Sequence, residues 1–270
     1  FDYWRAYNQH MVYFDGYVHG DDWNYLQWEG YETDGVLKFG TEFIDDAGDD
    51  PFLLVLSPHQ PHFTPFEFAP DAYYERLPET LELPANVPDE MQEEACVMYR
   101  HYLAMILALD DMVGNLMSHL ERIGKADDTL IVFTSDHGTE GGAHGVKPWL
   151  KKHPHDESLR VPTILRWPST IPAGGRCDAI TTIPDLFPSL CGLCDIPVPR
   201  SVEGRDLSDA WLGKPGAETR DAALLMNFSA AYDWLVDGME WRGVRTATHT
   251  YARWLDGKVE LFDRRNDPLE

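Results

Sequence analysis

The sequence is short of basic residues. Its 270 residues include 22 Lys and Arg against 46 Asp and Glu, which gives a formal net charge of -24. A surface of this sign repels the phosphate backbone of nucleic acids and anionic lipids, so we expect no nucleic-acid partner. An anion site would need a local cluster of cations to overcome the global charge, and clustered lysines are therefore informative.

Long apolar segments are also absent. No run approaches the roughly 18 apolar residues of a membrane-spanning helix, and no basic segment followed by an apolar one opens the chain. We therefore predict no membrane span. Residue 1 is Phe, so the true start of the protein is not visible. The compartment stays open between cytoplasmic, periplasmic and secreted.

Cysteines are few. Among the four, only Cys191 and Cys194 have the spacing of a C-x-x-C pair. They follow an apolar run, with no second pair and no histidine nearby, which favours buried thiols on a helix over zinc or redox chemistry. Four cysteines do not fix the redox compartment.

Short apolar runs alternate with helical patterns over residues 33 to about 200. The strands are predicted at 52–57, 130–135 and 161–167, and the helices at 33–46, 89–123 and 185–194, with Thr33-Asp34 as the first cap. Continuous apolar strands are typical of a sheet that is buried on both faces. The order therefore predicts an α/β fold with a doubly wound, mostly parallel sheet.

Both ends of the chain have a different texture. Residues 1–32 are rich in aromatics and glycine, which indicates irregular wall or edge structure. After residue 215 the pattern predicts four short strands, at 222–228, 241–248, 249–255 and 259–263, with a hairpin turn at Asp256-Gly257. We expect an α/β catalytic domain over 1–215 and a small antiparallel α+β subdomain over 216–270.

Polar side chains follow two of the predicted strands. His59 and His62 come after the first, and Asp136 and His137 after the second, ahead of a glycine-rich loop that ends in Lys151-Lys152. In open α/β sheets ligands bind outside the carboxyl ends of the strands. Carboxylates and imidazoles can hold a metal, and lysines suit a tetrahedral anion. Taken singly, each feature also fits a cap, a loop histidine or a solvated lysine; their coincidence favours a metal-bridged anion site.

These residues resemble the sulfatase family of the alkaline phosphatase superfamily. The resemblance rests on Thr134-Ser-Asp-His-Gly138, Gly142-Ala-His-Gly145, Lys151 and the stretch from Asp156 to Pro162, with support from Leu56 to Pro65 upstream. It covers most of residues 30–270. It implies an alkaline phosphatase-like fold and arylsulfatase-like, metal-dependent hydrolysis of a small-molecule or carbohydrate sulfate ester.

The resemblance also implies residue roles. Asp136 and His137 would ligate the metal, most often calcium in this family, with manganese or zinc as alternatives. His62 would contact the sulfate or the leaving-group oxygen, and Lys151 would bind the sulfate. Lys152 is the nearest rival of Lys151, while His144 and His59 are further candidates for contact with the substrate.

One expected element is absent from the sequence. Sulfatases carry a Cys or Ser, in a Cys/Ser-x-Pro/Ala-x-Arg setting, that becomes the formylglycine nucleophile, and none of the four cysteines lies in that setting. The chain thus resembles a fragment that lacks the N-terminal third. We expect no turnover from it alone, and we expect it to associate with the missing N-terminal segment or with itself. The alternatives are a phosphoester or phosphonate-ester hydrolase of the same superfamily and a non-catalytic fragment or binding protein.

Overall fold

The computed structural model describes residues 2–8, 10–228 and 240–270. The chain forms two compact units, Phe1–Ala126 and Asp127–Glu270, and each is described by itself. The predicted boundary at residue 215 lies inside the second unit. A separate subdomain over 216–270 stays a prediction.

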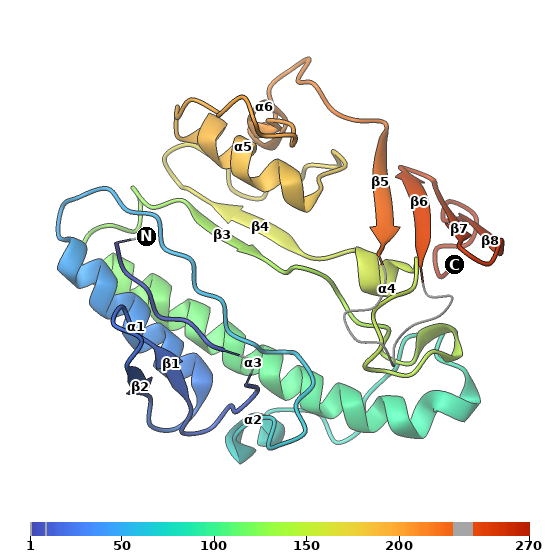
Figure 1. Ribbon diagram of the computed structural model, residues 1–270, viewed down its shortest axis with the longest axis horizontal. Coiled ribbons are helices and arrows are strands. Elements are labelled where there is room, and N and C mark those ends of the chain that lie inside the picture. The colour runs from blue at the N-terminus through green and yellow to red at the C-terminus, as the bar shows by residue number, and fades with distance from the viewer. Residues whose placement is uncertain (1, 9, 229–239) are drawn as a thin grey trace. The chain divides into compact units, whose positions relative to one another are not determined.

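Two helices form the centre of the first unit (Figure 1). α1 spans Glu32–Ala47, and α3 spans Gln92–Arg122 after the 3-10 turn η1 at Asp89–Met91. Both helices were predicted at these places and are confirmed. The predicted cap is wrong: α1 begins after Tyr31, which makes no side-chain cap bond, because Thr33 is buried within the first turn.

The apolar face of α3 lies in the core of the first unit. Asp89–Arg122 is the one helix in the described part of the chain with the length and composition of a membrane span, since an 18-residue window of it has a mean hydropathy of 1.2. Its residues belong to two buried clusters of this unit, Ala104, Met105 and Ala108 with Tyr13 and Tyr31, and Leu109 and Met112 with Val36. Only 33% of that window is buried inside the structure, so packing in the core explains part of this composition.

The rest of the first unit is short elements and loops. β1 (Tyr17–His19) and β2 (Tyr25–Gln27) form an antiparallel hairpin within the aromatic-rich segment, and α2 spans Asp71–Glu75. The buried strand predicted at 52–57 is not found: these residues pair with no strand among the described ones. Leu53 and Val55 are 76% and 71% exposed. Leu56, on the other side of the segment, packs against the cluster that contains Val36 of α1. The segment is therefore apolar throughout but not buried on both faces.

The second unit opens with a two-stranded sheet. β3 (Ile131–Thr134) and β4 (Thr163–Arg166) pair antiparallel, with Ile131 opposite Arg166. Both strands were predicted, but the parallel arrangement was not correct for this pair. An apolar run indicates a strand and leaves the direction of its neighbour undetermined. The loop between the strands carries the 3-10 turn η2 (Ala143–Gly145) and α4 (Asp156–Leu159).

Two helices follow β4, α5 (Ile183–Leu193) and α6 (Ser208–Trp211). α5 begins with a capping box, in which Thr182 and Asp185 satisfy each other's main-chain N–H groups. Cys191 is buried on α5 as predicted. Cys194 is exposed at the end of the helix, and both thiols are free.

The C-terminal residues form the predicted antiparallel sheet. Its strands are β5 (Ala222–Asn227), β6 (Trp241–Thr246), β7 (His249–Trp254) and β8 (Val259–Asp263), in the order β5-β6-β7-β8 (Figure 1). Trp241, Ala252 and Trp254 form a buried cluster on one face. The predicted turn lies between β7 and β8, where Gly257 takes a φ of 95° that side chains rarely adopt.

Candidate functional site

Asp136 and His137 follow β3 directly, with exposed side chains. Asp136 Oδ1 accepts hydrogen bonds from the His137 main-chain N–H at 2.8 Å and the Ser135 hydroxyl at 3.2 Å. Burial would raise the pKa of the Asp136 carboxyl, but these hydrogen bonds and the neighbouring imidazole outweigh it and lower that pKa. The carboxylate is therefore charged and able to bind a cation at neutral pH.

A hydrogen bond of His137 decides which ring nitrogen can bind a cation. Nδ1 lies 2.8 Å from the Gly138 carbonyl oxygen, and because a carbonyl only accepts, Nδ1 carries a proton. In the neutral imidazole, the lone pair is then on Nε2, which lies 3.3 Å from Asp136 Oδ2. Two ligand atoms about 2.4 Å from one calcium ion, at right angles to it, are about 3.4 Å apart. The pair thus fits part of a divalent-cation site, with Gly138 orienting the imidazole.

The two candidate lysines lie on the loop before α4. Burial lowers the pKa of the Lys151 ammonium, the Asp136 carboxylate opposes that lowering, and the Lys152 charge adds to it. Lys151 and Asp136 therefore interact electrostatically within one unit. The loop is attached to the C-terminal sheet, since Trp241 Nε1 donates to the Lys152 carbonyl at 2.7 Å.

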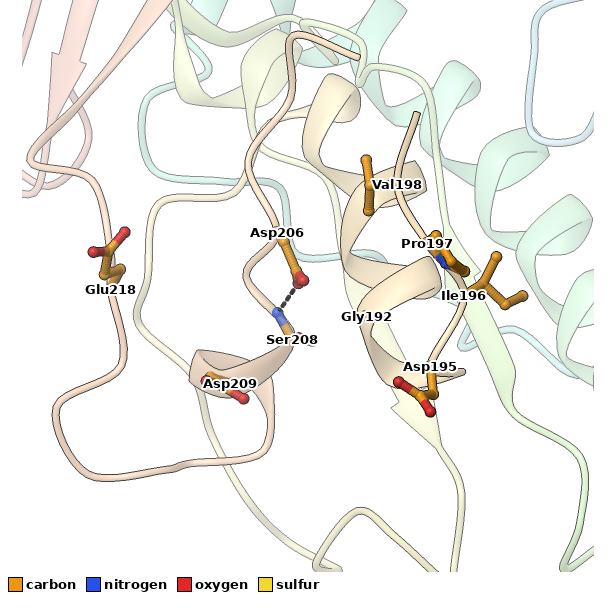
Figure 2. A pocket seen from close by; sticks show the side chains of 9 residues that line it. All are labelled: Gly192, Asp195, Ile196, Pro197, Val198, Asp206, Ser208, Asp209 and Glu218. Carbon is orange, nitrogen blue, oxygen red and sulfur yellow. Dashed lines mark hydrogen bonds between the residues drawn. The ribbon is translucent and has the colours of Figure 1, made fainter. Parts of the chain in front are cut away.

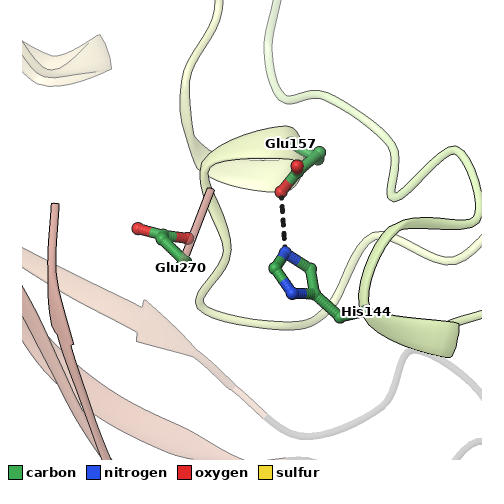
Figure 3. Close-up of side chains that lie close together, drawn as sticks. All are labelled: His144, Glu157 and Glu270. Carbon is green, nitrogen blue, oxygen red and sulfur yellow. Dashed lines mark hydrogen bonds and ion pairs between the residues drawn. The ribbon is translucent and has the colours of Figure 1, made fainter. Parts of the chain in front are cut away.

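His144 is engaged with a carboxylate. Its Nε2 lies 3.3 Å from Glu157 Oε2, and Glu270 lies beside the pair (Figure 3). The hydrogen bond with Glu157 raises the pKa of His144 despite its burial. Ligand atoms of the three residues lie within 4.8 Å of one another, so by distance they could hold a metal. However, Arg264 Nε lies 4.0 Å from Glu270 Oε1, and this cation would repel a metal ion.

A buried carboxylate that sequence reasoning missed organises the same loop. Glu140 is fully buried; its oxygens accept from the Ser158 hydroxyl at 2.7 Å and from His155 Nδ1 at 2.9 Å. These bonds tie the segment after Gly138 to α4. The only signal in the sequence was an acidic residue beside the Asp-His-Gly motif, and nothing marked its partners.

The two loop histidines belong to the first unit. His62 is exposed, and its Nδ1 lies 2.6 Å from the Phe63 carbonyl, so Nδ1 is the donor. His59 bonds to the buried carboxylate of Glu32. The structure brings Asp136, His137, Lys151 and Lys152 into one region of the second unit. That His62 joins them around a substrate stays a prediction.

A cavity of about 580 Å³ lies beside α5 and α6 in the second unit (Figure 2). Carboxylates dominate its lining, and Figure 2 shows Asp206 accepting from the Ser208 main-chain N–H. The lining consists of Gly192, Asp195, Ile196, Pro197, Val198, Asp206, Ser208, Asp209 and Glu218. With four acidic residues and no basic one, this cavity does not suit a sulfate ester.

The chain is similar to known sulfatases over its whole length. It is 34% identical to an ulvan-active sulfatase of Formosa agariphila over 100% of this chain and 53% of that protein. Among solved structures, a putative sulfatase from Bacteroides fragilis matches with a TM-score of 0.86 and 26% identity, over 100% of this chain and 60% of the other. A structure in complex with D-glucosamine-2-N,6-O-disulfate matches with a TM-score of 0.87 and 22% identity, over 100% and 70%.

These likenesses bear on the fold and the family. The α/β class and the alkaline phosphatase-like fold are confirmed by the solved structures. The chain spans about half the length of the Formosa protein, at 53%. Residues 1–196 match the sulfatase family, and residues 142–270 match the C-terminal region of N-sulphoglucosamine sulphohydrolase. With a match over most of its residues, this chain belongs to the sulfatase family.

Proposed function

We propose that the full-length protein hydrolyses sulfate esters with a divalent metal held in part by Asp136 and His137. The observation that carries the proposal is the 3.3 Å separation of Asp136 Oδ2 and His137 Nε2, with His137 Nδ1 occupied by the Gly138 carbonyl. A lone pair and a carboxylate oxygen repel each other at this distance unless a proton or a cation stands between them. Calcium is the metal we favour, with manganese and zinc as alternatives.

The bound cation would neutralise negative charge on the sulfate oxygens. Lys151 would bind the sulfate, because its ammonium is partly buried and interacts electrostatically with the Asp136 carboxylate. His62 would contact the sulfate or the leaving-group oxygen through Nε2, as Nδ1 is held by Phe63. Lys152 and His144 are secondary candidates for contact with the substrate. Glu157 already interacts with the His144 imidazole and would compete with the substrate for it.

The nucleophile in this proposal lies outside the 270 residues. We propose a formylglycine hydrate, one hydroxyl of which would attack sulfur and release the alcohol, while the metal and Lys151 would neutralise the developing charge. The chain alone would then bind ligands without turning them over. A carbohydrate sulfate is the favoured substrate class, supported by the glucosamine disulfate bound to one structural neighbour.

Turnover of 4-nitrophenyl sulfate by the full-length protein tests the proposal. We expect a chelator to abolish turnover and added calcium to restore it, and Asp136→Asn to weaken the response to calcium. Asp128→Asn, an exposed aspartate of the same unit, is the matched control and should behave as wild type. Turnover that survives the chelator would refute the metal, and faster turnover of 4-nitrophenyl phosphate or of a phosphonate monoester would favour phosphoester or phosphonate hydrolysis.

A further inference from the structure

The β1–β2 hairpin of the first unit carries two large aromatic side chains on its surface. Trp23 is 73% exposed and Tyr25 is 66% exposed, whereas aromatic side chains in a folded domain ordinarily bury most of their area. Trp23 lies in the turn between the strands, and Tyr25 is the first residue of β2. Neither belongs to the two buried clusters described above, so packing in those clusters does not account for them.

The main chain of Trp23 is strained. Its φ is 59°, in the left-handed region, where a bulky side chain is an outlier and where Gly or Asn is preferred. The turn is closed by two hydrogen bonds of 2.9 Å, from the Trp23 N–H to the Gly20 carbonyl and from the Gly20 N–H to the Asn24 carbonyl. Strained residues that the surrounding structure holds in place gather at binding sites. The fold of the turn therefore gives no reason for a tryptophan here, and a ligand would.

Further contacts make the hairpin rigid. The Asp21 carboxylate accepts from the Trp4 main-chain N–H at 2.9 Å and from the Arg5 guanidinium at 2.7 Å, which ties the turn to the N-terminal segment. A Cβ added at Gly20 would lie 2.6 Å from the Asn24 side-chain oxygen, so the turn is also tight. A preorganised surface loses little freedom when a ligand binds. The two aromatic rings are thus presented at a low cost of ordering.

A buried imidazole contacts both exposed rings. The centroid of the His19 ring lies 5.0 Å from that of Tyr25 and 5.7 Å from that of Trp23. His19 is only 9% exposed, and its Nδ1 has no hydrogen-bond partner among the residues that the structure describes. A buried polar atom without a partner is rare in native structures and often belongs to a functional site. This second observation, made on a different residue, agrees with a ligand at the hairpin.

The charges around the hairpin decide which kind of partner fits. The net charge of -24 and the exposed Asp22 disfavour a sulfated ring, an acidic protein and a second copy of the chain. The Asp21 charge is already compensated by Arg5, so no concentrated charge selects a basic partner. The same hairpin exposes two uncharged polar side chains, Asn24 and Gln27. Aromatic faces with polar groups around them suit a neutral sugar ring, which has an apolar C–H face and a rim of hydroxyls.

Resting on the proposed function for the choice of a carbohydrate, we propose that Trp23 and Tyr25 form a stacking surface for neutral, unsulfated sugar residues of a polysaccharide. The surface lies wholly in the first unit and needs no residue of the second. Sugar rings would lie against the indole and phenol faces, and the amides of Asn24 and Gln27 would bond their hydroxyls. Binding there would retain a long substrate on the protein while its sulfated residues are hydrolysed elsewhere.

Trp23→Asn separates ligand binding from the fold of the turn. Asparagine adopts the left-handed conformation more readily than tryptophan, so this substitution removes the ring and relieves the main chain. Trp23→Phe restores an aromatic face. Phe66→Ala is the matched control, because Phe66 is 60% exposed in the same unit and lies outside the hairpin.

The experiment titrates cellohexaose, xylohexaose and mannohexaose into the full-length protein by calorimetry. We expect wild type to bind at least one of these neutral hexaoses and Trp23→Asn to weaken that binding by about 10-fold, the scale of one aromatic contact. Trp23→Phe should recover part of the loss, and Phe66→Ala should match wild type. Trp23→Asn should change the affinity for a fully sulfated form of the same hexaose by less than about 2-fold, and its urea midpoint should equal or exceed that of wild type.

Four results would overturn the inference. They are no binding of any neutral hexaose by wild type, equal effects of Trp23→Asn and Phe66→Ala, a lower urea midpoint for Trp23→Asn, which would assign the indole to the fold, and a change of oligomeric state with Trp23→Asn in sedimentation, which would assign the surface to a second copy. Wild-type protein that binds a neutral hexaose through Trp23 and cleaves no sulfate ester would refute the proposed function and leave this surface in place.

Discussion

A Cβ atom added at Gly138 would lie 1.9 Å from the main-chain carbonyl oxygen of Glu157. The Gly138 N–H also donates to the Ser158 carbonyl at 2.9 Å, so the turn after Asp136-His137 is pressed directly onto α4. Only a residue without a side chain permits this approach. The orientation of the candidate metal ligands therefore depends on a backbone contact with residues some twenty positions away.

Gly138→Ala should displace this turn, because the clash is with backbone and cannot be relieved by a rotamer change. We expect a loss of about 1–3 kcal/mol in the free energy of unfolding and a clear loss of calcium affinity. Urea denaturation and calorimetric titration of calcium measure the two effects. Gly114→Ala on α3 is the control: its added Cβ meets nothing within 4 Å, and alanine should stabilise the helix slightly. Equal effects of the two substitutions would contradict the role of the contact.

Separate substitution of Lys151 and Lys152 tests which lysine binds sulfate. Lys151→Ala should lower kcat/KM on a sulfate ester by about 100-fold, the scale for removing a preorganised donor to developing charge. Lys152→Ala should cost less than about 5-fold, the scale of a surface charge. The Lys152 carbonyl keeps its bond from Trp241 in that variant, so the loop is preserved. A larger loss of kcat/KM for Lys152→Ala than for Lys151→Ala would mean that Lys152 is the lysine that binds sulfate.

Asp185 should be essential to the second unit. It is fully buried and accepts from the Thr182 N–H at 2.7 Å, the Arg205 N–H at 2.8 Å and the Arg220 guanidinium. Asp185→Asn would leave the largely buried Arg220 charge without its carboxylate, at a cost of about 3 kcal/mol or more in the free energy of unfolding.

A surface pair provides the control for Asp185. Asp178 and Arg176 form an ion pair whose side chains are 78% and 82% exposed. Asp178→Asn should leave the denaturation midpoint unchanged, because exposed ion pairs contribute little. A similar shift for Asp178→Asn and Asp185→Asn would mean that burial does not decide the effect.

Acidification should weaken the first unit through His101. Burial, assisted by the Arg100 charge, lowers the pKa of His101 below its ordinary value of 6.5. The folded imidazole stays neutral and accepts the Tyr74 hydroxyl at 2.7 Å, while the unfolded chain takes up a proton as the pH falls below 6.5. The contribution of His101 to the free energy of unfolding is thus complete above pH 6.5 and is lost as the pH falls below that value. The loss is less than about 1.4 kcal/mol for each pH unit.

Urea denaturation of wild type and His101→Gln between pH 7.5 and pH 5 isolates this contribution. Glutamine keeps a polar group beside Tyr74 and does not titrate. The variant should lose less stability on acidification than wild type does. Identical pH dependence in the two proteins would show that another group is responsible.

Local patterns in the sequence predicted most elements correctly. α1, α3, α5 and the four C-terminal strands lie within a few residues of their predicted positions. Two predictions failed where the outcome depends on a neighbour: residues 52–57 have no strand partner among the described residues, and β3 and β4 pair antiparallel. Hydrophobic runs indicate which segments can form strands, whereas whether a strand pairs, and in which direction, is set by elements that are far away in the sequence.

The candidate site shows the same division. The motif at Asp136-His137-Gly138 and the lysines after it were visible because their residue types are local and specific. Glu32, Glu140 and Trp241 were not identified, since a buried acid or an aromatic residue carries no sign of which histidine or carbonyl it will bond. Partners of this kind are recognised only after folding brings them together.

The sequence by itself determined the family, the order of helices and strands, and which side chains are chemically able to bind a metal and an oxyanion. The tertiary structure decided the direction of the strand pair, the tautomers of His62 and His137, and the approach of Gly138 to Glu157. The reason is physical: periodicity and residue type act over a few neighbouring positions, while hydrogen-bond direction and steric contact depend on atoms that meet only in the folded chain.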